Sequence, residues 1–172
     1  DHEEGAPLRY ADIAMFNAKT QRLGVEVYRS EIDRRTPARL AMLGDLRAAI
    51  EGGDLRVHLQ PKLDLNSGTV VGAEALVRWT HPVRGIVSPA QFVRVAEDTG
   101  LIKQLTDLML SKGIADLRRF HDSGFHLGLS VNLSTRDLLD QDLPAKFDAL
   151  LVKHRVPAEA FCLETTESAI MD

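Results

Sequence analysis

The sequence predicts an α/β fold in which helices alternate with the strands of a largely parallel sheet. From residue 55 onward, segments with strand-like alternation and segments with helical periodicity follow one another. Most of the strand-like segments are separated by a whole helix, which is the spacing of βα units joined by crossovers. The composition, 44% apolar and 27% charged, is that of an ordinary globular domain.

The beginning of the chain is organised differently from the rest. Apolar residues at helical spacing predict a helix over residues 10–19, and the alternation in residues 25–28 predicts a short strand. The charged residues 29–37 indicate a linker. The next predicted helix covers residues 38–51, with a Thr-Pro pair before it and two glycines at its end.

A hairpin is expected to open the sheet. Residues 55–65 and 69–79 both read as strands, and Asn66-Ser67-Gly68 between them is typical of a tight turn. The first strand is therefore predicted to run antiparallel to the second.

Helices and strands then alternate along the rest of the chain. Ser88-Pro89-Ala90-Gln91 has the form of a capping box with proline at the first helical position, and it predicts a helix that ends near Gly100. The remaining expected elements are a helix over residues 102–121, a strand over 126–134, a helix over 136–154 and a strand over 160–167.

Charge, hydropathy and cysteine content argue against several functional classes. The net charge is −4 without long runs of one sign, so no surface for polymeric nucleic acid is predicted. No apolar run approaches transmembrane length and no signal peptide is visible, so we expect a cytoplasmic segment without membrane contact. This expectation leaves open a membrane anchor in another domain of the parent protein. Cys162 lies in an apolar run and is expected to be a small buried residue in a reducing compartment.

Three predicted strands carry metal-ligand side chains toward their carboxyl ends, namely Glu74, Asn132 and Glu164. Parallel strands end at one edge of a sheet, where α/β folds place their sites. Two carboxylates and an amide suit Mg²⁺, Mn²⁺ or Ca²⁺ better than Zn²⁺, and a cation would neutralise Glu74, which lies between two alanines. The alternative is structural: Arg78 shares the face of Glu74 and is a possible ion-pair partner, and Asn132 is a possible turn residue. The residue pattern alone leaves both open.

Three separated segments, residues 59–102, 130–134 and 163–171, have the motifs and spacing of a known family. In them the sequence resembles the EAL domain family of cyclic di-GMP phosphodiesterases, from about residue 43 to the end. More weakly, residues 9–19 and 25–28 resemble the closing helix and strand of a GGDEF (diguanylate cyclase) domain.

The resemblance implies a partial TIM-like (β/α) barrel with one antiparallel first strand, preceded by a helix-strand tail and a linker helix. It implies three regions. Residues 1–29 would be the C-terminal remnant of a GGDEF-like domain, residues 30–42 a linker with the start of its helix, and residues 43–172 the truncated N-terminal half of an EAL domain.

The resemblance also implies roles for individual residues. Glu74, Asn132 and Glu164 would bind catalytic Mg²⁺ or Mn²⁺ in a two-metal site, with Glu74 and Glu167 counted as catalytic, and Glu167 would support the adjacent loop. The implied substrate contacts are Gln60 and Arg78, the latter a fork that matches a phosphate. The implied reaction is metal-assisted hydrolysis of one phosphodiester bond, giving the linear dinucleotide.

The family's paired aspartates, catalytic lysine and a further glutamate lie beyond residue 172, so the site is expected to be incomplete and this piece alone inactive. The implied partners are cyclic di-GMP, a GGDEF domain in the same chain and, as a possibility, a second EAL domain in a homodimer. The alternative function is that of a degenerate EAL domain, a receptor that binds cyclic di-GMP without cleaving it.

Overall fold

The computed structural model describes residues 6–20, 24–29 and 37–165. The chain divides into two compact units, residues 1–42 and 43–172.

The first unit contains helix α1 (Ala6–Thr20), which confirms the helix expected at residues 10–19 and extends it. Residues 25–28, expected to form a strand, have no regular secondary structure, so this prediction is wrong. Val25 and Val27 are 82% and 69% exposed, and within residues 6–20 and 24–29 no strand is available to pair with them. The ring of Tyr28 instead stacks on that of Tyr10, with centroids 4.1 Å apart.

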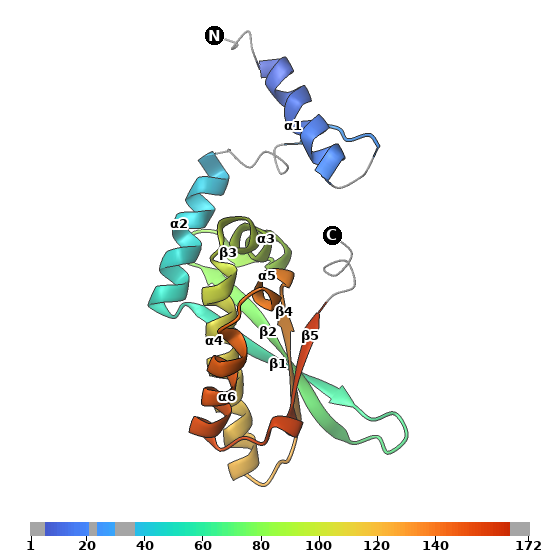
Figure 1. The fold of residues 1–172 in the computed structure, drawn as a ribbon, viewed down its shortest axis with the longest axis vertical. Coiled ribbons are helices and arrows are strands. Elements are labelled where there is room, and N and C mark those ends of the chain that lie inside the picture. Colours follow the sequence, from blue (N-terminus) through green and yellow to red (C-terminus); the bar gives the residue numbers. More distant parts are fainter. Residues whose placement is uncertain (1–5, 21–23, 30–36, 166–172) are drawn as a thin grey trace. The chain divides into compact units, whose positions relative to one another are not determined.

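The second unit is built on one five-stranded sheet in the order β1-β2-β4-β5 (Figure 1). The hairpin β1–β2 is antiparallel, whereas β2–β4 and β4–β5 are parallel, so the predicted α/β class and antiparallel first strand are confirmed. A short strand that was not predicted, β3, pairs with the end of β2. The strands are β1 (Leu55–Leu63), β2 (Val70–His81), β3 (Gly85–Val87), β4 (Gly128–Leu133) and β5 (Phe161–Thr165).

The turn between β1 and β2 forms where predicted. The carboxylate of Asp64 accepts hydrogen bonds from the backbone amides of Asn66 (2.9 Å) and Ser67 (2.7 Å). Gly68 has φ 67°, a left-handed conformation that glycine adopts without strain.

The helices follow the predicted pattern with one break. The expected helix 136–154 is two helices, α5 and α6, because Pro144 lacks the amide hydrogen needed to continue a helix through this point. Asp140, in the connection, accepts a hydrogen bond from the backbone of Asp142. The helices are α2 (Pro37–Gly52), α3 (Pro89–Thr99), α4 (Ile102–Asp122), α5 (Thr135–Leu138) and α6 (Leu143–His154), with a 3₁₀ turn at Ala158–Ala160.

The predicted capping box lies at a different helix. Ser88 precedes α3, but its side chain makes no capping hydrogen bond. At α5 the hydroxyl of Ser134 accepts from the amide of Arg136, and the carboxylate of Asp137 accepts from the amide of Ser134 at 3.0 Å.

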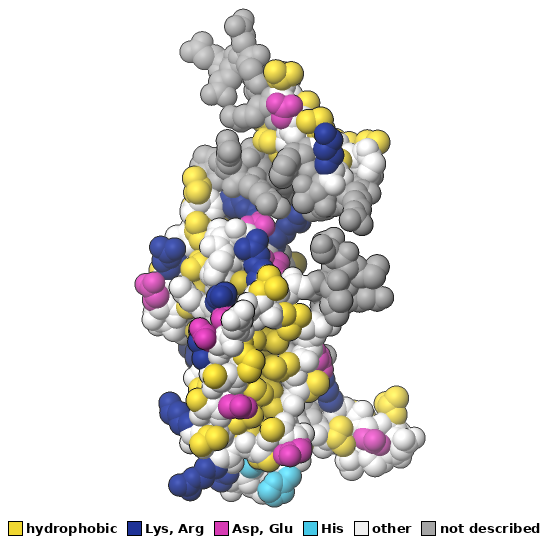
Figure 2. Space-filling model, viewed as in Figure 1, with side chains coloured by type: hydrophobic (Ala, Val, Ile, Leu, Met, Phe, Trp, Pro, Cys, Tyr) yellow, Lys and Arg dark blue, Asp and Glu magenta, His cyan; other side chains and the backbone are white. Residues whose placement is uncertain are grey.

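The core lies between one face of the sheet and helices α4 and α6 (Figure 1). Gly113 lets α4 approach β4 closely, since a β-carbon there would lie 3.1 Å from Leu129. At the sheet edge, Phe147 of α6 contacts Phe161 of β5 edge-on, and Figure 2 shows hydrophobic side chains gathered in this region. The buried core residues are Ala73, Ala75, Met109, Leu110, Ile114, Leu117, Leu129, Val131, Leu133, Leu143, Leu151 and Val156.

Cys162 is exposed, not buried, because β5 is the last strand of the described sheet and Cys162 lies opposite Ser130 on the face away from helices α4 and α6. Among the described residues, no helix combines the length and the apolarity needed to cross a lipid bilayer.

Candidate active site

Glu74 lies on the face of the sheet opposite the core. Its neighbours Ala73 and Ala75 are 8% and 2% exposed and pack beneath the helices, so the alternation of a strand turns Glu74 the other way. Glu74 is half-buried, and not fully buried as the apolar surroundings in the sequence suggested. The two alanines are thus small apolar residues of the core, and the carboxylate between them lies on the opposite face of the sheet.

Glu74 also lies within its strand and not at its end, because β2 continues to His81. However, the parallel pairing of β2 with β4 runs only from Gly72 to Ala75. Glu74 therefore lies near the carboxyl end of the parallel-paired part, which is the position where α/β sheets hold their sites.

The sheet register brings the predicted ligand residues together. Gln60 is opposite Glu74 in the β1–β2 pair, and Asn132 is opposite Glu164 in the β4–β5 pair. The side-chain amide of Asn132 donates a hydrogen bond of 2.6 Å to Oε1 of Glu74. Glu74, Asn132 and Glu164 thus occupy three adjacent strands on one face.

A lysine that the sequence analysis did not select joins this cluster. Nζ of Lys62 lies 2.5 Å from Oε1 of Glu164 and 2.6 Å from Oγ of Ser130. The Lys62 ammonium and then the Ser130 hydroxyl hold the pKa of Glu164 below its usual value, and the hydrogen bond to Glu164 raises the pKa of Lys62. Strand alternation could have identified both residues, since Lys62 is two positions after Gln60 and Ser130 two before Asn132.

Arg78 is half-buried, and its Nη1 donates to the backbone oxygen of Val77 at 2.9 Å. In the part of the chain that the structure describes, Arg78 and Glu74 form no ion pair, so the structural alternative for Glu74 is not the arrangement observed. Arg78 and Asn132 both line a cavity of about 260 Å³ between the sheet and helices α3 and α4, together with Glu97.

A buried hydrogen-bond network fixes the loop that leaves β4 just after Asn132. Asp137 is 2% exposed, and its Oδ2 accepts from Oγ1 of Thr106 at 2.8 Å and from the amide of Ser134 at 3.0 Å. Burial raises the pKa of Asp137. The Ser134 hydroxyl also donates to Glu97 at 3.0 Å, which ties this loop to α3.

The donor atoms present fit a hard divalent cation. Two carboxylates and one amide oxygen supply the oxygen ligands that Mg²⁺ and Mn²⁺ prefer. Over residues 6–20, 24–29 and 37–165, no group of three or more His, Cys, Asp or Glu is arranged to hold a metal, so the set depends on the amide of Asn132. Glu167, the other predicted catalytic residue, lies outside the described residues.

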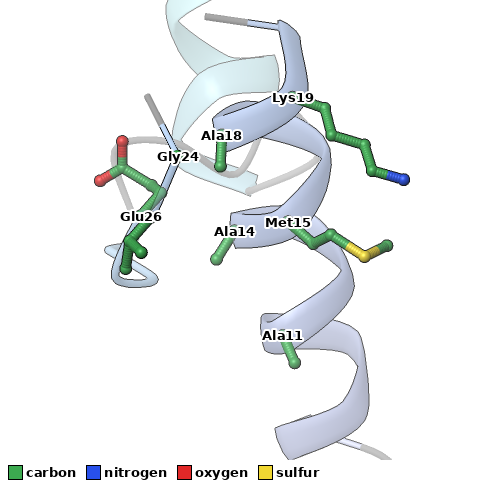
Figure 3. A pocket seen from close by; sticks show the side chains of 8 residues that line it. Ala11, Ala14, Met15, Ala18, Lys19, Gly24 and Glu26 are labelled. Atoms are coloured by element: carbon green, nitrogen blue, oxygen red, sulfur yellow. The ribbon is translucent and has the colours of Figure 1, made fainter. Parts of the chain in front are cut away.

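A second hollow lies in the first unit, between α1 and the segment at residues 24–26. Ala14 and Ala18 lie on the side of the helix nearest to Gly24 and Glu26 (Figure 3). This hollow contains none of the predicted site residues.

Comparison with known proteins shows what family the chain is part of. Residues 43–172, which include the whole sheet and the candidate site, match the family model of the EAL domain. This chain belongs to the EAL domain family.

Two curated relatives illustrate the family. The bifunctional diguanylate cyclase/cyclic di-GMP phosphodiesterase MucR of Pseudomonas aeruginosa is 36% identical over 163 residues, which cover 94% of this chain and 24% of MucR. The cyclic di-GMP phosphodiesterase PdeR of Escherichia coli is 33% identical over 168 residues, 97% of this chain and 25% of PdeR. The chain thus spans about a quarter of the length of these relatives.

Solved structures of EAL domains share the fold. The PaMucR phosphodiesterase in complex with c-di-GMP is 36% identical, with a TM-score of 0.73 over 76% of this chain and 53% of that one. The FimX EAL domain from Pseudomonas aeruginosa, bound to c-di-GMP, is 25% identical, with a TM-score of 0.67 over 74% of this chain and 51% of that one. The α/β sheet described above is therefore part of the EAL domain's TIM-like barrel.

Proposed function

We propose that this EAL segment is the N-terminal half of a cyclic di-GMP phosphodiesterase domain, which hydrolyses one phosphodiester bond to give the linear dinucleotide. The observation that carries the proposal is the meeting of Glu74, Asn132 and Glu164 on one face of three adjacent strands. The phosphodiesterase names of MucR and PdeR support the choice of substrate. We further propose that the protein acts in the cytoplasm.

The proposed mechanism assigns Glu74, Asn132 and Glu164 to hold Mg²⁺ or Mn²⁺. Such ions, when bound, activate a water and stabilise the charge on the phosphoryl oxygens. The carbonyl oxygen of Asn132 is the atom suited to this role, which requires its amide to turn from the hydrogen bond it now donates to Glu74. Glu167 is proposed to support the same site.

Two residues are proposed to bind the cyclic dinucleotide. Gln60 is exposed beside Glu74 and offers both a donor and an acceptor. Arg78 lines the cavity next to Asn132, and its planar guanidinium suits a phosphate. Together they would orient the scissile bond relative to the carboxylates.

The longer context is also proposed. Residues 1–29 would be the end of a GGDEF-like domain and residues 30–42 its linker to the EAL segment. The match to MucR supports this, because it is longer than the EAL segment alone and MucR is named a diguanylate cyclase as well as a phosphodiesterase. Association of two EAL domains into a homodimer remains part of the proposal.

The test measures cyclic di-GMP cleavage by the longer protein that carries this chain, with Mg²⁺ or Mn²⁺ and chromatographic separation of the linear product. We expect Glu74→Gln to lower the rate by about 100-fold or more, because it removes a charged metal ligand. Lys103→Met, which removes a lysine paired with Asp140 away from the site, serves as the control and should cleave normally.

The 172-residue chain by itself is expected to cleave little or no cyclic di-GMP. Robust cleavage by this chain would contradict the proposed incompleteness of its site. If the longer protein bound cyclic di-GMP tightly but never cleaved it, the receptor function would replace the hydrolytic one.

A further inference from the structure

Lys62 occupies an unusual position for a side chain of the first strand. It starts on β1, yet its ammonium contacts Ser130 on β4 and Glu164 on β5, the far edge of the described sheet. The register explains how it can reach, because the residue opposite Lys62 on β2 is Gly72 and the residue opposite Gly72 on β4 is Gly128. At these two positions no side chain stands in the way.

The hairpin is also irregular next to this residue. Lys62 pairs with Gly72, whereas Leu63 pairs with Val70, so Val71 is an extra residue that bulges β2. Bulges bend a strand and re-aim the side chain next to them, and they are common beside functional sites. Lys62 thus lies beside a bulge of the partner strand, and the pair of glycines leaves its side chain a free path to the metal-ligand cluster.

The charges on this face suggest what Lys62 does there. Glu74 and Glu164 are the acidic members of the cluster, and Lys62 is the cation that contacts it. An ammonium bound to Oε1 of Glu164 takes the position that a divalent ion needs, since two cations on the same carboxylate oxygen repel each other. The side chain of Lys62 is 40% exposed and has a flexible stem, so it is free to leave.

We propose that Lys62 is an internal counter-cation of the metal site, which holds Glu164 in the metal-free protein and is displaced from it when a divalent ion binds. This inference rests on the proposed function, because it takes Glu164 to be a metal ligand. Lys62 is accordingly a positioning residue: it keeps the ligand carboxylate in place before the metal arrives, at the expense of metal affinity.

The test is the affinity for Mn²⁺ of the longer protein that carries this chain, measured without substrate from the electron paramagnetic resonance signal of free Mn²⁺. Lys62→Met keeps the apolar stem but removes the charge, and we expect it to tighten Mn²⁺ binding about two- to fivefold, the range expected from an ion pair at this exposure. Lys62→Arg keeps the charge and should stay within about twofold of the wild type. Lys103→Met, which breaks a lysine–aspartate pair away from the site, should leave the affinity unchanged.

The gain should depend on Glu164. In a Glu164→Gln background, Lys62→Met is expected to give no tightening, because the carboxylate for which lysine and metal compete is gone. Equal or weaker Mn²⁺ binding by Lys62→Met relative to the wild type would overturn the inference alone. If neither the wild type nor Lys62→Met bound Mn²⁺, the inference and the proposed metal site would be overturned together.

Discussion

Thr106→Val is expected to destabilise the EAL segment, because the lost hydroxyl donates to a carboxylate that has almost no access to water. Thr106 on α4 and Asp137 on α5 are 5% and 2% exposed, and the bond between them is 2.8 Å long. Valine has nearly the shape of threonine, so the substitution removes the hydrogen bond without opening a cavity. The pair therefore isolates one interaction at the loop that follows Asn132.

The size of the effect follows from the charge and burial of the acceptor. A hydrogen bond to a charged group contributes about 1.5–3 kcal/mol, and a buried carboxylate that loses a donor has no water to replace it. Asp137 keeps the amide of Ser134 as a donor, so the lower part of that range, about 2 kcal/mol, is expected. For a chain of this length, this corresponds to a fall in Tm of roughly 4–8 °C.

The effect should also depend on pH. Burial raises the pKa of Asp137, and the hydrogen bond from Thr106 opposes that rise, so its loss raises the pKa further. A carboxyl whose pKa is raised on folding favours the folded state when protonated, and this contribution is lost as the pH rises through the folded-state pKa. The deficit of the variant is thus expected to be largest at neutral pH and to shrink toward about pH 4.

The measurement is urea unfolding followed by the fluorescence of Trp79, the single tryptophan of the chain, which is 1% exposed. Thr99→Val is the matched control, because the hydroxyl of Thr99 lies on the exposed side of α3 and donates to a backbone carbonyl of its own helix. If Thr106→Val lowered the free energy of unfolding by less than about 0.5 kcal/mol, or by the same amount at neutral pH and at about pH 4, the reasoning would be refuted.

Two other substitutions test how the strands and helix ends are held. Gly72→Ala should lower the free energy of unfolding by about 1–3 kcal/mol, because its β-carbon would lie 2.8 Å from the backbone oxygen of Gly128. Gly128→Ala should lower it less, because its β-carbon would have no neighbour closer than 3.7 Å. Equal losses for the two variants in urea unfolding would contradict this. Ser134→Ala should lower the free energy of unfolding by about 1 kcal/mol, because it removes a helix cap, and Ser88→Ala should lower it clearly less. If thermal unfolding showed the larger loss for Ser88→Ala, the cap predicted from the sequence at Ser88 would be the correct one.

Local patterns in the sequence predicted the sheet well because they are the patterns that decide burial. The alternation in residues 69–79 places Ala73 and Ala75 in the core and Glu74 on the other face, as the structure shows. The same alternation predicted a strand wrongly at residues 25–28. Alternation indicates that successive side chains face opposite sides of a strand, but it does not supply the neighbouring strand that the backbone must pair with. A strand predicted from periodicity therefore forms only where the fold also provides a strand to pair with it.

The misplaced helix cap has a similar origin. Ser88 and Ser134 both precede a helix with a polar residue three positions later, so their local sequences are nearly equivalent. They differ in tertiary context, because Asp137 is held in place by Thr106 from α4. For Lys62, strand alternation indicates the face shared with Gln60, but its contacts lie 68 and 102 residues away in the sequence and follow only from the register.

The core and the candidate site are selected by the same register. A slip of β4 by one residue against β2 would turn Val131 from the core to the polar face and Asn132 toward α4. Exposing a valine costs about 2 kcal/mol, and a buried amide without partners costs more, so the slipped sheet is strongly disfavoured. The packing of Val131 with Ala75 and Ile114 therefore also holds Asn132 beside Glu74. It follows that core substitutions that loosen this packing should weaken the proposed metal binding even though they touch none of the three proposed ligands.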